Sequence, residues 1–182
     1  MIEAERISSR IDHPGVEDRT MRQQHPALVV VAVSCALLAG GARQLSAQLP
    51  KDACAQVTQA QVASALGMPV HEGQSLNSLG TACSWAATSP NKARLTVQFM
   101  VADSYDRLKS ERMPHVEKSP VAGIGDDAFS QTIPFSTTVP KMTTLFVRKG
   151  RTMVVVRTYD VPSSAKQLSA EKAVAHAVVA RL

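Results

Sequence analysis

The sequence has few aromatic residues and only three cysteines, and it lacks the short motifs that mark many reactive sites. Aromatic side chains make up 4% of the 182 residues, so a core must be built mainly from Val, Leu, Ala and Met. Neither a Gly-x-Ser-x-Gly segment nor a Cys-x-x-Cys pair is present. The sequence therefore gives no support to a serine hydrolase of the nucleophile-elbow type or to a dithiol redox site.

The charge distribution argues against nucleic-acid binding. The chain carries 20 Lys and Arg against 15 Asp and Glu, a formal net charge of +5 at pH 7. These cations form no basic run, and the few aromatic residues do not alternate with them, whereas a nucleic-acid-binding surface needs such a patch. A charge of this size favours solubility and gives mild attraction to the anionic polymers of a cell envelope.

The N-terminal region has the pattern of a targeting signal. Residues 26–42 carry no charge, and their strongly apolar part, 27–39, falls short of the about 20 residues that a spanning helix needs. Met21 and Arg22 supply a start and a positive charge upstream, and Ala47 supplies a small residue for cleavage. We therefore expect a signal peptide over 21–47, cleavage near Ala47, and one periplasmic or secreted domain over 48–182.

Other interpretations of this region stay open. Residues 1–20 are net negative, unlike the start of a signal peptide, so we interpret them as a mis-assigned start or a disordered extension, with translation beginning at Met21. An intact precursor mass that begins at Met1 would contradict this. Ala42 is a second cleavage candidate. Cys35 could be a lipoprotein cysteine, although largely apolar residues follow it. An uncleaved membrane anchor is the remaining alternative.

The two cysteines of the expected mature domain, Cys54 and Cys83, predict a disulfide. An exported protein pairs such cysteines by default, and closing a loop of about 30 residues stabilises a fold by about 3.5 kcal/mol in the chain-entropy model. A metal site lacks support, because His71 is the only histidine near either cysteine. We expect Trp85 to pack against the disulfide or the first helix, with stacking on a ligand as the alternative role.

Capping residues and apolar periodicity predict three helices. Thr58 and Gln61 form a capping box for a helix that ends at Gly67. A second helix is expected from Asp103 or Ser104 to Arg112. A third runs to Leu182 and begins at Ser164 or Ser169, and we expect its core stripe to consist of Ala170, Val174, Ala177, Val178 and Leu182.

Alternation predicts hairpin-linked strands. The segment 94–99 alternates cleanly, and we expect further strands over 83–88, 143–149 and 151–159. We interpret 70–80 as an irregular connection, with a short edge strand as the alternative. The side chains expected to be buried on the second strand are Leu95, Val97, Phe99 and Val101. Lys149-Gly150 predicts a tight turn, and the apolar run 154–156 predicts a central strand.

The predicted order is helix, two strands, helix, three strands, helix. This order indicates the α+β class, with a single antiparallel sheet and about three helices packed mainly on one face.

The order of short motifs resembles a broad group of bacterial exported and lipoprotein domains of unknown function. Their pattern is a cysteine before a Thr-capped helix ending Leu-Gly, then Cys-x-Trp, then Gly-x-Gly-Asp-x-Ala-aromatic, then a Lys-Gly hairpin and an Ala-rich helix. The corresponding segments here are Cys54, 58–67, 83–85, 123–129, 149–150 and 169–182. The resemblance implies a layout similar to PsbP-like sheets with helices, and it brings no catalytic residues. The chain departs from the group at the lipoprotein cysteine.

Three segments are candidate contact sites. Asp126 and Asp127 in the Gly-rich segment 123–127 could bind a cation or phosphate, but the surrounding spacing fits a tight turn better, in which aspartate accepts backbone amides. Arg148, Lys149 and Arg151 could form an anion or lipid-headgroup patch, or simply a solvated hairpin tip. Ile133 and Phe135 lie in the Pro-containing segment 130–141, which we interpret as a binding loop or a linker.

The sequence favours a non-catalytic binding domain in the cell envelope. No metal site or cofactor is expected, because His71, His115 and His176 lack partners nearby in the sequence. An envelope protein or a small ligand is the expected partner. The alternatives are an anion- or lipid-surface binder that uses the basic hairpin, and an enzyme or enzyme accessory whose site assembles from Asp126, Asp127 and His115.

Overall fold

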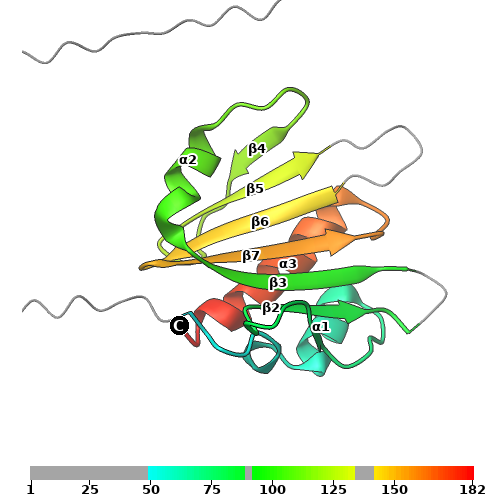
Figure 1. The fold of residues 1–182 in the computed structure, drawn as a ribbon. Helices are drawn as coiled ribbons and strands as arrows, with labels where there is room; N and C mark the ends of the chain where they lie inside the picture. Colours follow the sequence, from blue (N-terminus) through cyan, green and yellow to red (C-terminus); the bar gives the residue numbers. More distant parts are fainter. Residues whose placement is uncertain (1–48, 89–91, 134–141) are drawn as a thin grey trace, which may run out of the picture. The chain divides into compact units, whose positions relative to one another are not determined.

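The structure is a computed structural model that describes residues 49–88, 92–133 and 142–182. These residues belong to one compact unit, Gln44–Leu182, shown in Figure 1. The sequence interpretations of residues 1–47, and Phe135, lie outside the described residues. The helices are η1 Cys54–Gln56, α1 Gln59–Leu66, η2 Ala102–Ser104, α2 Tyr105–Ser110 and α3 Ser164–Val179. The strands are β1 Gln74–Ser75, β2 Ala82–Ala86, β3 Arg94–Val101, β4 Glu117–Pro120, β5 Asp127–Ile133, β6 Met142–Lys149 and β7 Thr152–Tyr159.

The strands form one antiparallel sheet in the order β1-β2-β3-β7-β6-β5-β4. The α+β class and the order of elements predicted from the sequence are confirmed, and the short strands β1 and β4 extend the sheet at its two edges. β7 lies in the middle, as the apolar run 154–156 predicts. The turn between β6 and β7 has Gly150 at φ 56°, a left-handed conformation that suits glycine.

Local signals account for the start and end of α1. The Thr58 hydroxyl accepts a hydrogen bond from the Gln61 backbone N–H, and the Gln61 side chain accepts one from the Thr58 N–H. Gly67 ends the helix at φ 67° and donates to the carbonyls of the last turn. Val57 and Val62 are both buried. The predicted capping box and glycine stop are confirmed.

The third helix begins at the earlier of its two predicted positions. Ser163 is the N-cap, and its side chain accepts a hydrogen bond from the Lys166 N–H. The helix ends at Val179, three residues before the predicted end, and Leu182 is 44% exposed. The prediction that Leu182 completes the core stripe is therefore wrong, because the helix ends before it and leaves it beyond the sheet.

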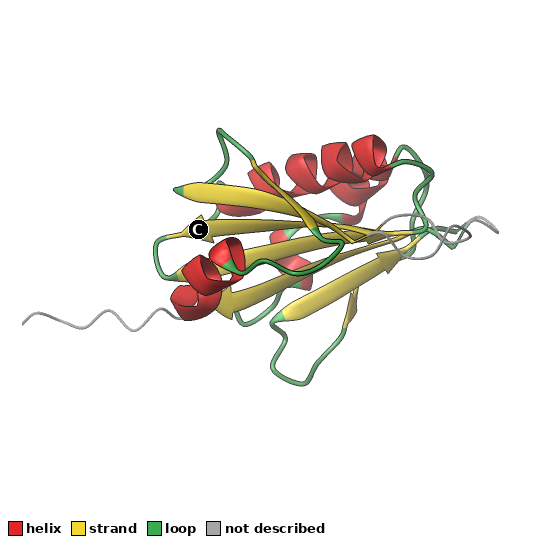
Figure 2. Ribbon diagram, turned by 90° about the horizontal axis from the view of Figure 1, so that it is seen from above, coloured by secondary structure: helices red, strands yellow, loops and turns green. Residues whose placement is uncertain are grey.

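Two faces of the sheet have different cover, since successive strand residues point to opposite sides. On the first face, α1 and α3 pack over a core that includes Leu95, Val97, Leu145, Val154 and Val156. On the second face, α2 packs over a smaller cluster of Tyr105, Phe129, Phe146, Met153 and Val155. Figure 2 shows helices on both sides of the sheet. The two longer helices thus share one face, as expected.

The sequence misplaced several boundaries on the second face and at the strand ends. α2 ends at Ser110 rather than Arg112. Residues 130–133 continue β5 rather than starting a loop. Val101 is 38% exposed, although alternation predicted its burial, because β3 extends past the start of β2, where Ala82 pairs with Gln98. None of the helices within 49–88, 92–133 and 142–182 has the length and apolar content needed to cross a membrane.

A disulfide between Cys54 and Cys83 is present, with Cα atoms 5.1 Å apart, which confirms the predicted staple. It ties the segment before α1 to β2. Trp85 is buried in the same core. A Cβ atom at Gly73 would lie 2.7 Å from the Trp85 Nε1 atom and 2.8 Å from the Cys83 Sγ atom. The β1 edge can therefore approach the staple only because residue 73 has no side chain.

We expect Gly73→Ala to lower the free energy of unfolding by about 1–3 kcal/mol, because the added methyl group would overpack the Trp85 ring and the disulfide. Urea unfolding, followed by the fluorescence of the single tryptophan, measures this change. Ser78→Ala in the exposed turn 76–80 is the matched control and should leave the free energy of unfolding within about 0.5 kcal/mol of the wild-type value. Equal midpoints for the two variants would contradict this account of Gly73.

Candidate functional site

The two aspartates of the Gly-rich segment clamp the basic hairpin. Asp126 accepts a hydrogen bond from the Gly150 N–H at 2.6 Å and pairs with Lys149 at 3.0 Å. Asp127 pairs with Lys109 at 2.6 Å, and its second cationic neighbour is Arg148 at 3.9 Å. These contacts agree with the tight-turn interpretation, in which aspartate accepts backbone amides.

The same pairs hold both carboxylates in their charged form. The Gly150 N–H, followed by Lys149, lowers the pKa of Asp126, and the Lys109 hydrogen bond lowers the pKa of Asp127. Arg148 also pairs with Asp106 at 3.0 Å. The hairpin cations Arg148 and Lys149 are thus largely neutralised by neighbouring acids and do not form an open basic patch.

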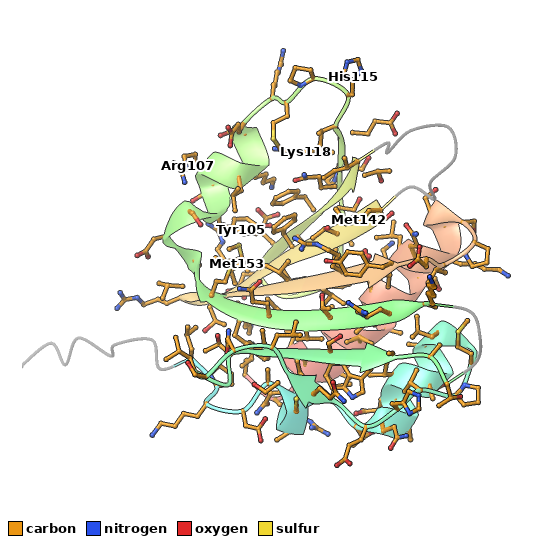
Figure 3. All side chains as sticks on the ribbon, turned by 45° about the vertical axis from the view of Figure 1, so that its right-hand side comes forward. Tyr105, Arg107, His115, Lys118, Met142 and Met153 are labelled. Carbon is orange, nitrogen blue, oxygen red and sulfur yellow. A yellow bond between two sulfur atoms is a disulfide. The ribbon has the colours of Figure 1, made fainter. Side chains whose placement is uncertain are left out.

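The residues of a conceivable reactive site do not come together. Across residues 49–88, 92–133 and 142–182, no group of three or more His, Cys, Asp or Glu side chains is placed to hold a metal ion. His115 precedes β4, whose Glu117 pairs with Thr132 near the far end of β5. Asp127 begins β5, about 17 Å from Thr132 at strand spacing. Figure 3 shows His115 on the loop beyond α2.

α2 seals one part of the second face with an aromatic cluster. The rings of Tyr105 and Phe129 pack edge to face at 5.5 Å, and those of Phe129 and Phe146 stack at 4.8 Å. The Arg148 guanidinium lies 4.9 Å from the centre of the Tyr105 ring. Burial, and then the charge of Asp127, raise the pKa of the Tyr105 hydroxyl, so it remains protonated at ordinary pH. The Lys118 ammonium donates to the carbonyl of Leu108 in α2 and to that of Glu111, the residue after α2.

Beside this cluster, a row of polar side chains crosses the second face on all seven strands. The strand register aligns one polar residue from each strand, so that each of these residues is the cross-strand partner of the one on the neighbouring strand. Along the sheet the row consists of Gln74, Ser84, Thr96, Arg157, Thr144, Gln131 and Lys118. Two of its members are cations and none is a carboxylate. We call this set the polar row.

Arg157 is held in a fixed position at the centre of the polar row. Its Nε atom donates to the Thr144 hydroxyl at 3.1 Å, and its Nη1 atom donates to the Tyr159 hydroxyl at 3.2 Å. These bonds leave part of the guanidinium on a half-buried surface. An arginine oriented in this way is suited to carboxylate or phosphate groups, which it can bind with two parallel hydrogen bonds.

Arg94 lies beside the polar row and borders two hollows. One, of about 370 Å³, is lined by Ala86, Lys92, Tyr159 and Asp160 among others, and the second, of about 220 Å³, includes His71, Glu72 and Ser84. Arg94 is exposed and makes no ion pair with the described residues. Both hollows are partly open to solvent, and they lie at the lower end of, or below, the range of about 300–1,000 Å³ typical of small-molecule sites.

The structure separates the predicted contact residues. Trp85 is 1% exposed, so its ring can pack but cannot meet a ligand at the surface. Asp126, Asp127, Arg148 and Lys149 belong to the clamped hairpin. Arg151 follows the same turn. Ile133 ends β5 and is half-buried. The polar row and Arg94 escaped sequence reasoning, because only strand register brings their members together.

A buried polar group under α3 was also missed. Gln167 and Glu171 are fully buried. The side-chain amide oxygen of Gln167 accepts a hydrogen bond from the Thr143 hydroxyl at 2.9 Å. One Glu171 carboxylate oxygen accepts hydrogen bonds from the Thr158 N–H and hydroxyl at 3.1 and 2.8 Å. The spacing of Gln167, Ala170, Glu171 and Val174 on one helix face was the available signal. Burial raises the pKa of Glu171 to about 8, partly offset by the Thr158 bonds.

Comparison of the chain with protein-family models, with curated proteins and with solved structures found no match.

Glu171→Gln tests the buried carboxyl. Since the folded state binds the Glu171 proton more tightly than the unfolded state, the group stabilises the fold fully below about pH 4.5, and this contribution declines until about pH 8. We expect the substitution to remove a decline on the order of a few kcal/mol between those values, as measured by urea midpoints at several pH values.

Glu117→Gln, which removes an exposed carboxyl, serves as the matched control and should keep the wild-type pH profile. If the urea midpoints of the wild type and of Glu171→Gln changed with pH in the same way, the Glu171 carboxyl would have the same pKa in the folded and unfolded states, and the prediction would be wrong.

Proposed function

We propose that this chain is an exported, non-catalytic binding protein of the cell envelope, and that it binds an acidic segment of a partner protein on the open part of its second sheet face. The observation that carries the proposal is the polar row, which has Arg157 at its centre and no carboxylate among its members. Arg94 adds an exposed cation beside it.

The shape of this face supports a protein partner over a small molecule. Thr144 and Gln131 are buried and Lys118 is bound to backbone carbonyls at the end of α2, so the accessible part of the row lies on β1, β2, β3 and β7. At the usual separation of about 4.8 Å between strands, this part extends over roughly 14 Å. Polar side chains at regular spacing on a sheet can meet an extended segment along its length. A rigid sheet, held on its other face by α1 and α3, orders few groups on binding and so keeps the entropic cost low.

The alternatives have less support in the geometry. An anion- or lipid-binding hairpin would need its cations available, but Arg148 and Lys149 pair with Asp106, Asp126 and Asp127. An enzyme that uses His115 and Asp126 would need them together, and they lie toward opposite ends of β5. The disulfide is compatible with an oxidising compartment, which supports the expected export.

The proposal is tested by binding of the mature domain, residues 48–182, to partners captured from envelope extract and to a synthetic Asp- and Glu-rich peptide. We expect the affinity to fall with rising salt and to drop at least about tenfold in Arg94→Glu, because close charge pairs across an interface carry this much or more. Arg157→Gln should weaken binding similarly, with its thermal unfolding measured alongside.

Lys166→Glu provides the matched control, since it makes the same charge change at an exposed position on α3, away from the second face. It should retain the wild-type affinity. An equal loss of affinity in Lys166→Glu and Arg94→Glu would reduce the effect to net charge, and unchanged binding in Arg94→Glu and Arg157→Gln would rule out the polar row as the binding surface.

A further inference from the structure

The large apolar side chains exposed on the described residues gather at one end of the sheet. They are Leu76, Leu79, Met100, Val101 and Leu182, with exposed fractions between 37% for Met100 and 75% for Leu79. Scattered exposed apolar residues are common in soluble proteins, whereas their concentration in one region marks an interaction surface. We call this set the apolar end.

Register and hydrogen bonds bring these five residues to the same end. The turn 76–80 precedes β2, and the Phe99 N–H donates to the Thr81 carbonyl, so Met100 and Val101 lie beside this turn. The Ala53 N–H donates to the Gly80 carbonyl. Arg181 donates to the Ala55 and Gln56 carbonyls, which brings the C-terminus to the same place. Figure 1 shows the C-terminus at the end of the sheet where β2 begins.

The apolar side chains of this end protrude from the turn 76–80, from the last two residues of β3 and from the residues after α3, and as a set they do not line a groove. Leu76 and Leu79 belong to one turn, and Leu182 follows the end of α3. Of the five, only Leu76 borders one of the described hollows. Protruding leucines suit a fluid apolar layer, because they can enter it without a complementary surface, whereas the core of a protein interface requires close packing.

The charges at this end favour neither sign of partner. Lys149 pairs with Asp126 and Arg148 pairs with Asp106. Of the other cations, Lys51 adjoins Asp52 in the sequence, and the carbonyl of Arg151 accepts a hydrogen bond from the N–H of Ala102, which adjoins Asp103. Arg181 donates to the η1 carbonyls. Attachment through this end should therefore depend on apolar contact far more than on charge.

The apolar segment that precedes the domain in the sequence favours a lipid bilayer as the layer that these side chains meet. The described domain begins at Leu49, and Lys51 packs against Gly80 beside Leu79. The uncharged segment 26–42, with its apolar run 27–39, precedes Leu49 in the sequence by only a few residues. In the alternative in which the run 27–39 is retained as a membrane anchor, it serves as a tether that joins the domain at Leu49, at the apolar end.

We propose that the apolar end rests on a lipid bilayer, with Leu76 and Leu79 entering the interfacial region and Met100, Val101 and Leu182 around them. Leu76 borders the hollow that also includes Arg94 and Ser84, so the lipid contact adjoins the second sheet face there, whereas Leu79 borders none of the hollows. The lipid contact differs from a basic-hairpin mechanism, because it needs no anionic headgroup.

Flotation of the mature domain, residues 48–182, with lipid vesicles tests the proposal without the tether. These residues contain the whole described core and the disulfide, and they fall within one compact unit. We expect similar binding to vesicles of phosphatidylcholine alone and to vesicles that also contain phosphatidylglycerol, at both low and high salt. Leu76→Ser combined with Leu79→Ser should lower the partition coefficient at least about tenfold.

Arg94→Glu is the matched control for the other surface and should bind vesicles as the wild type does. Leu79→Ser alone should in turn keep the wild-type affinity for the acidic peptide and the wild-type thermal unfolding, since Leu79 is 75% exposed and, unlike Leu76, does not border the hollow beside Arg94. These crossed outcomes distinguish failure of this inference from failure of the proposed function.

Any of four results would overturn the inference. These are no flotation of the wild type, flotation that needs anionic lipid and disappears in high salt, undiminished flotation of the double serine variant, and a wild-type dimer in solution that the double variant abolishes. The last result would assign the apolar end to contact between two copies of the chain.

Discussion

The pairing of β7 with β3 and β6 is the constraint on which the rest of the structure depends. Because strand side chains alternate, one register decides both faces at once. Val154 and Val156 enter the core under α1 and α3, while Val155 and Arg157 take the opposite face. A shift by a single residue would bury Arg157 without a partner and expose the valines. The apolar core therefore fixes the position of the polar row.

A second set of contacts holds the N-terminal part of the domain to this sheet. The Cys54–Cys83 disulfide, the hydrogen bond from Ala53 to Gly80 and the bonds from Arg181 to the η1 carbonyls converge on one region. They join the first helical turn, β2 and the C-terminus. The disulfide and these hydrogen bonds therefore hold the turn 76–80 in one position, with its two leucines exposed to solvent.

The most suggestive motif of the sequence turns out to have a local role. The Gly-rich segment at 123–127 carries two aspartates, and both are occupied by the hairpin and by α2. Gly125 approaches the Arg148 carbonyl so closely that a Cβ atom would lie 2.5 Å from its oxygen. The segment therefore locks β5 to the hairpin. The surfaces available for partners lie elsewhere, on the open sheet face and at the apolar end.

Local chemistry allowed the sequence alone to determine the caps of α1, the disulfide, the Lys149-Gly150 turn, the central strand and the α+β class, because each of these depends on residues close together in the chain or on a simple pattern. The exposure of Val101 and Leu182 and the early end of α2 depended on where neighbouring elements stop, which no local pattern records. The polar row, the burial of Glu171 and the gathering of exposed leucines were decided by tertiary structure, since long-range strand register and helix docking bring together residues up to about a hundred positions apart.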